Sequence, residues 1–214
     1  MRKIAAAAAT AGSTAAVGLL LSATAHASTV VVTGGGPVTL AASTGIVVTD
    51  PVNGRTITCP TSTGSGDVPN GTALAEVGSI GAIRFSLCAG SGFNFALTPK
   101  ISNLARWKIK VTGLTSGGRT PGVLTGVSMH ASAAGGLCQA DLDGPGGAGS
   151  STGQSEVGYD NATGELALTG STNLRFHNVT AGCLGFVSTG HPASLGGTYV
   201  VTNGQGAHPQ ITSA

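Results

Sequence analysis

Hydrophobic and polar positions alternate along short segments of this chain. In residues 107–111 the sequence Trp-Lys-Ile-Lys-Val places apolar side chains on one face and two lysines on the other, as in a strand that covers a core and leaves one side wet. Residues 123–130 and 165–169 alternate in the same way. After residue 27 no stretch keeps a helical period for three turns. The pattern predicts strands over residues 29–33, 38–40, 46–49, 56–59, 82–88, 93–98, 106–112, 123–132, 139–142, 165–169, 174–179 and 198–202.

This spacing of short strands is typical of an all-β domain, an antiparallel β-sandwich or a barrel-like fold. Glycine provides 36 of the 214 residues, well above average usage, and the excess supplies turns. The segment 160–164, Asp-Asn-Ala-Thr-Gly, favours a tight hairpin. Two segments poor in apolar residues, 61–70 and 144–153, are interpreted as surface loops, the second of them mobile.

The first residues predict a secretory signal peptide. Arg2 and Lys3 precede an apolar run over 4–21, and Ala25-His26-Ala27 provides the small residues of a cleavage site. We therefore expect a signal peptide over 1–27 and a secreted, extracellular protein whose single all-β domain spans 28–214. With no cysteine near the cleavage site and no apolar C-terminal tail, we expect no membrane anchor.

Removing the leader makes the chain neutral. Two of its ten Lys and Arg residues lie in the leader, which leaves eight basic side chains against eight acidic ones. Nucleic-acid binding depends on phosphate neutralisation by many cations, and binding to anionic lipid depends on a polybasic patch. Neither class of partner is expected.

The four cysteines, Cys59, Cys88, Cys138 and Cys183, all follow the leader. An even number in an exported chain, with no CxxC spacing, predicts two disulfides instead of a metal site. Neighbouring strands of a β meander lie close in space. We therefore favour Cys59 with Cys88 and Cys138 with Cys183, while the other two pairings remain open.

Motifs for catalysis or cofactor binding are few in this sequence. The mature histidines show neither an HExxH motif nor helical i, i+4 spacing, and no Gly-x-Ser-x-Gly elbow marks an activated serine. Asp141 and Asp143 share one face of a strand end, where paired carboxylates serve glycoside hydrolysis or bind calcium. With one Trp and two Tyr as sugar platforms, a solvated strand end is the favoured interpretation. We assign no catalytic residue, cofactor or metal ligand.

Two groups of residues are candidate ligand contacts. Trp107 with Lys108 and Lys110, in a basic patch that also holds Lys100 and Arg106, offers a ring face and ammonium groups to an anionic cell-surface polymer such as a wall teichoic acid. The alternative is that these lysines mark the wet face of a strand and protect its edge. Phe93 and Phe95 line either the core or a small apolar pocket.

Five pieces of the chain carry a resemblance: Arg-Phe-Ser-Leu-Cys at 84–88, Gly-Val-Ser-Met-His-Ala at 126–131, Gly-Cys-Leu-Gly at 182–185, Gly-Thr-Tyr-Val-Val at 197–201 and Gln-Ile-Thr-Ser at 210–213. In these the chain resembles an uncharacterised family of small secreted actinobacterial proteins. The resemblance implies export, four paired cysteines and a β-rich fold, and it implies no activity. Enediyne-carrier apoproteins are similar in class alone, as exported β-sandwiches with two disulfides.

The sequence therefore favours a secreted, non-enzymatic protein that acts as a binding or surface-associated structural module. A carrier of a small apolar ligand held between sheets is the second hypothesis, motivated by Phe93 and Phe95. A hydrolase without a recognisable motif is the third.

Overall fold

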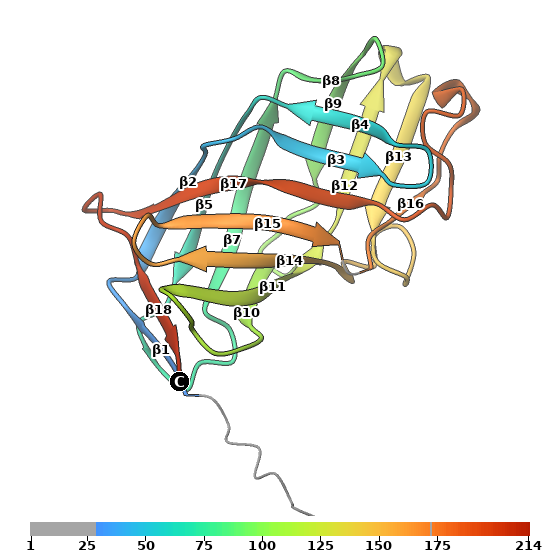
Figure 1. Cartoon of the computed structure of the whole chain (residues 1–214). Coiled ribbons are helices and arrows are strands. Elements are labelled where there is room, and N and C mark those ends of the chain that lie inside the picture. Colours follow the sequence, from blue (N-terminus) through green and yellow to red (C-terminus); the bar gives the residue numbers. More distant parts are fainter. Residues whose placement is uncertain (1–28, 172) are drawn as a thin grey trace, which may run out of the picture.

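The computed structural model describes residues 29–171 and 173–214 (Figure 1), so the expected signal peptide at 1–27 lies outside the described residues. Within them, nearly all regular structure is β-strand, with two single-turn 3-10 helices, η1 (Ala134–Gly136) and η2 (Ala181–Cys183). In this part of the chain no helix is long and apolar enough to cross a membrane. The all-β prediction is confirmed.

The main sheet forms an antiparallel up-and-down barrel. Its strands join end to end into eight paths across the described residues, and consecutive paths run in opposite directions. Seven paths are broken near the middle and the eighth is continuous. The paths are β2 (Gly36–Ala42) with β3 (Ile46–Asp50), β4 (Arg55–Cys59) with β5 (Thr61–Val68), β7 (Gly78–Ser86) with β8 (Cys88–Gly90), β9 (Phe93–Pro99) with β10 (Trp107–Val111), β11 (Arg119–Val127) with β12 (Met129–Ala133), β13 (Cys138–Asp143) with β14 (Gly153–Asp160), β15 (Glu165–Ser171) with β16 (Arg175–His177), and β17 (Ser194–Asn203).

The breaks divide the barrel into two halves that share β17. In the terminal half, the order β2-β5-β7-β10-β11-β14-β15-β17 closes because β17 pairs with both β15 and β2. In the distal half, β3 pairs with the start of β17 and leads through β4, β8, β9, β12 and β13 to β16. A bridge between Arg175 and Pro192 then returns β16 to the segment just before β17. Both halves are therefore closed.

A small sheet caps the terminal half at the end where both ends of the described chain lie (Figure 1). It contains β18 (Gln210–Ser213), β1 (Val30–Thr33) and β6 (Gly71–Thr72) in that order. Val32 of β1 and Ile211 of β18 are buried. The main-chain N–H of Thr29 donates to the carbonyl of Ala214 at 2.9 Å, so the two ends of the described chain close the cap together.

Side chains fill the barrel interior. An eight-stranded barrel is just wide enough for its inward-facing residues to pack against one another. The largest fully buried side chains include Trp107, Leu124, Met129, Phe176 and Tyr199. Burying a side chain of this size stabilises a fold by roughly 1.5–3 kcal/mol, so the interior acts as the core.

Both predicted disulfides are present. Cys59–Cys88 links β4 to β8, which are neighbours in the distal half. Cys138–Cys183 ties the start of β13 to η2, in the long connection between β16 and β17. The pairing of consecutive cysteines, favoured for a meander, is confirmed.

One predicted loop is a strand. Residues 61–68 form β5, which pairs with β2 on one side and β7 on the other, although 61–70 was interpreted as a surface loop. Its glycines suit a place where two strands approach closely, because a Cβ on Gly64 would lie 2.8 Å from the carbonyl oxygen of Ala82. Low strand propensity is thus outweighed by tertiary packing.

The alternation predicted over 123–130 is also interrupted. Gly126 has a φ of +79°, and the pairing of β11 with β14 shifts between Thr125 and Val127. This β-bulge moves the inward phase by one residue, so Leu124 and Val127 are both buried. The hairpin predicted over 160–164 is confirmed as the turn between β14 and β15, where the N–H of Gly164 donates to the carbonyl of Asp160 at 2.9 Å.

Candidate functional site

A polar groove of about 630 Å³ runs along the outer wall of the barrel. Strands β10, β11 and β14 border it, with the connection before β10 on one side and the glycine loop, residues 144–152, on the other. We call it the basic groove. Its lining includes Glu76, Arg106, Lys108, Lys110, Thr152 and Gln154. The sequence predicts the cations on one strand face and a surface loop over 144–153, but it does not predict that the two line the same groove.

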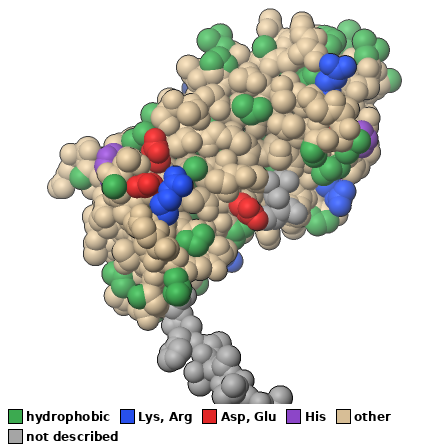
Figure 2. Space-filling view, viewed as in Figure 1, with side chains coloured by type: hydrophobic (Ala, Val, Ile, Leu, Met, Phe, Trp, Pro, Cys, Tyr) green, Lys and Arg blue, Asp and Glu red, His purple; other side chains and the backbone are tan. Residues whose placement is uncertain are grey.

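The cations of the basic groove outnumber its acids. Lys108 and Lys110 point outward from β10 because every second residue of a strand faces the same side. Lys108 Nζ lies 3.0 Å from the carboxylate of Glu76, and Lys110 Nζ lies 4.0 Å from it. Within the described residues, the exposed guanidinium of Arg106 forms no ion pair. The basic groove thus holds three cations and one carboxylate, on a molecule whose visible face carries few charged side chains (Figure 2).

Asp143 holds the opposite wall in place. Its carboxylate is fully buried and accepts hydrogen bonds from the Ser128 and Ser150 hydroxyls at 2.8 and 3.0 Å. The main-chain N–H groups of residues 144, 151 and 152 also donate to it, at 2.7, 3.1 and 3.0 Å. Burial raises the pKa of this carboxyl, but the hydrogen bonds outweigh burial and lower the pKa below its ordinary value. The glycine loop is therefore anchored at several points.

A second polar cluster lies on the wall of the distal half around Asp141. The carboxylate lies 2.7 Å from Lys100 Nζ and 2.9 Å from His130 Nδ1, and it accepts a hydrogen bond from Asn178 Nδ2 at 2.9 Å. Burial raises the pKa of Asp141, yet the bonds from Lys100, Asn178 and His130 lower it to about 2. Lys100 is thus engaged by Asp141 and does not line the basic groove.

The His130–Asp141 pair has the geometry that orients a general base. A hydrolytic triad also needs a nucleophile hydrogen-bonded to the histidine. In the described part of the chain no Ser, Thr or Cys side chain forms a hydrogen bond to His130. Nor do three or more His, Cys, Asp or Glu side chains of these residues gather as a metal site. Asp141 and Asp143 are both buried, unlike the solvated strand end favoured from the sequence.

Trp107 and the two phenylalanines face inward. Trp107 is 1% exposed inside the barrel, so it offers no ring face to a ligand on the outer wall. Within the described residues its indole Nε1 has no hydrogen-bond partner. Phe95 stacks on Phe186 with ring centroids 5.3 Å apart and meets Phe93 edge to face at 6.3 Å. Of the predicted contacts, Lys108 and Lys110 lie in the basic groove.

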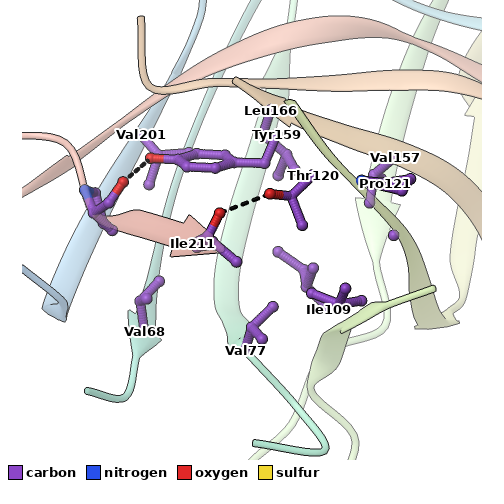
Figure 3. Close-up of a pocket in the computed structure, with 13 residues that line it drawn as sticks. Val68, Val77, Ile109, Thr120, Pro121, Val157, Tyr159, Leu166, Val201 and Ile211 are labelled. Atoms are coloured by element: carbon purple, nitrogen blue, oxygen red, sulfur yellow. Dashed lines mark hydrogen bonds between the residues drawn. The ribbon is translucent and has the colours of Figure 1, made fainter. Parts of the chain in front are cut away.

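A small apolar space of about 30 Å³ lies inside the terminal half (Figure 3). Val77, Ile109 and Ile211 are among its lining residues. The Tyr159 hydroxyl donates to the carbonyl of Pro209 at 2.7 Å, and the Thr120 hydroxyl donates to that of Ile211 at 2.6 Å. These hydroxyls tie the cap to the barrel. The space suits a water-sized molecule, whereas pockets for small-molecule ligands are roughly 300–1,000 Å³.

Comparisons with protein-family models, curated proteins and solved structures return no match for this chain. Function is therefore inferred from the chemistry of the basic groove and of the Asp141 cluster.

Proposed function

We propose that this protein is a secreted, non-enzymatic module that associates with a cell surface through the basic groove. The observation that carries the proposal is that three exposed cations, Arg106, Lys108 and Lys110, line an open groove together with an anchored loop. Exposed cations of this kind are available to a partner, since ion pairs with a neighbouring carboxylate in water contribute little.

The disulfides support an extracellular setting for this role. Two disulfides bridge all four cysteines, and such bonds persist in oxidising compartments. Together with the signal peptide expected at 1–27, they favour export. The resemblance to secreted actinobacterial proteins points the same way.

The test is retention of the purified, disulfide-bonded protein on washed cells. The protein is mixed with cells of the strain that produces it, the cells are sedimented, and the bound fraction is measured. We expect retention that falls in the double variant Lys108→Gln/Lys110→Gln. Arg84→Gln is the matched control, because Arg84 is an exposed cation that lies outside the groove. Equal retention of all three proteins, or none of the wild type, would refute the proposal.

The hypothesis of a carrier for a small apolar ligand requires the interior space of about 30 Å³ to enlarge. Native mass spectrometry of the protein from culture medium tests it, since a carrier would show added mass that denaturation removes. A hydrolase would instead show turnover on ester, glycan or peptide libraries that His130→Ala abolishes. Either result would contradict a module that only binds.

A further inference from the structure

We infer that the ligand of the basic groove is an extended, polyhydroxylated polymer with repeated negative charges. This inference rests on the proposed function and names the ligand class for the same site. One side of the groove supplies Arg106, Lys108 and Lys110, which attract phosphate or carboxylate groups. The other side supplies the hydroxyl of Ser151 and the side-chain amide of Gln154, which exchange hydrogen bonds with hydroxyls; the Thr152 hydroxyl beside them is already bonded to that of Ser150 at 2.8 Å.

Positive charge is spread along the basic groove. Lys108 and Lys110 are successive outward positions of β10, so their Cα atoms lie about 7 Å apart along the strand, and their ammonium groups lie 3.0 and 4.0 Å from the carboxylate of Glu76. Arg106 lies just before β10, and its guanidinium lies beside Gly81 of β7, where a Cβ would be 3.5 Å from Nη1. An open groove that is charged at more than one place along its length matches a linear ligand whose charges recur.

The lining of the basic groove disfavours single-stranded nucleic acid as the ligand. Proteins that bind single strands stack bases on exposed aromatic rings. The lining of the basic groove contains no aromatic residue, and the neighbouring Trp107 is buried inside the barrel. Its uncharged hydrogen-bonding side chains suit the hydroxyl groups of a polyol or sugar.

Glu76 allows a test in which two substitutions are expected to change the affinity for a polyanion in opposite directions. Its carboxylate pairs with Lys108 and Lys110, so a polyanion competes with it for the same ammonium groups. Glu76→Gln removes that competitor and leaves the cations, so it strengthens binding to a polyanion. If these side chains mattered only for the structure of the groove, both Glu76→Gln and Lys108→Gln would weaken binding.

The experiment measures binding of the purified disulfide-bonded protein to poly(glycerol phosphate), to polygalacturonate and, as the neutral control, to dextran. We expect binding to at least one anionic chain and none to dextran. Three ion contacts give a slope of log affinity against log salt of about −2. Affinity falls about two- to fivefold for Lys108→Gln, rises for Glu76→Gln and stays constant for Arg84→Gln. The two anionic chains separate a phosphodiester ligand from a uronate ligand.

The inference is overturned if dextran binds as well as the anionic chains, if added salt leaves affinity unchanged, or if Glu76→Gln weakens binding. Loss of cell retention in Lys108→Gln/Lys110→Gln without polyanion binding would overturn the ligand class and keep the proposed function. Polyanion binding without cell retention would overturn the proposed function and keep the ligand class.

Discussion

Replacing Asp143 by Ala is expected to release the glycine loop while the barrel stays folded. Asp143 is fully buried and accepts five hydrogen bonds, four of them from the glycine loop itself. In the variant the donors at residues 150–152 turn to water, because these residues are at least partly exposed, whereas the N–H of Gly144 is buried. The Ser128 hydroxyl, on a residue that is 1% exposed, loses its acceptor.

The size of the loss in stability depends on which hydrogen-bond donors can bond to water in place of Asp143. A hydrogen bond to a charged group contributes about 1.5–3 kcal/mol, so five would total roughly 7–15 kcal/mol if water replaced none of them. Since the donors at residues 150–152 do find water, we expect a loss of about 3–5 kcal/mol, the range for removing one partner of a buried charged network. Asp143→Asn keeps the side-chain shape, but its amide NH2 group faces the hydrogen-bond donors that the carboxylate accepts from. We expect the free energy of unfolding to fall by about 2–3 kcal/mol.

Urea unfolding and amide hydrogen exchange measure the two effects separately. We expect faster exchange at residues 144–152 in Asp143→Ala, with little change in the distant strands β3 and β4. Asp67→Asn is the control, because Asp67 is exposed at the end of β5 and substitutions at such sites change stability by about 0.5 kcal/mol or less. Unchanged exchange in the loop, or an equal cost for Asp67→Asn, would refute the anchoring argument.

Three further predictions follow from other contacts. The folded-state pKa of Asp141 is lowered to about 2, so the ionised carboxylate stabilises the fold above its unfolded pKa, and this stabilisation is lost as the pH falls from about 4 to about 2. Lys100→Met removes one cause of the lowered pKa and should raise the midpoint pH of acid unfolding, followed by circular dichroism. The double variant Cys138→Ala/Cys183→Ala removes a bridge with a sequence separation of 45 and should lower the free energy of unfolding by about 4 kcal/mol, measured with urea under non-reducing conditions. Tyr199→Phe removes the hydroxyl hydrogen-bonded to Ser62 Oγ at 2.8 Å and should cost about 1 kcal/mol in the same assay, because Ser62 keeps its bond to the carbonyl of Arg84; a loss above 3 kcal/mol would contradict this.

Local patterns predicted the parts of the fold that depend on neighbouring residues. Alternation over 107–111 predicted β10 with its lysines outward, and the cysteine order predicted both disulfides. The same alternation places Trp107 on the face of Ile109 and Val111, opposite the lysines, so the signal for its burial was present in the sequence. The prediction that Trp107 stacks on a ligand relied on its being aromatic and overlooked the strand face on which the alternation places it.

Long-range features could not be predicted from those patterns. β5 reads as a loop because Gly64 and Gly66 lower strand propensity, and their close approach to β7 is visible only after folding. Nor does alternation distinguish two packed sheets from a closed barrel, since both bury every second residue. The glycine loop was identified, but its anchoring by Asp143 depends on a buried carboxylate that the sequence pattern assigned to solvent.

The barrel geometry explains why the candidate site lies on the wall. Eight strands enclose a space that inward side chains fill, and in the terminal half a space of about 30 Å³ remains. We therefore expect ligand contacts to come from outward residues, which can vary without disturbing the core. Lys108 and Lys110 use this freedom on β10, Arg106 lies just before that strand, and Asp143 anchors the glycine loop that also lines the basic groove. A core substitution such as Leu124→Ala should therefore weaken folding and leave the ligand preference of the folded fraction unchanged.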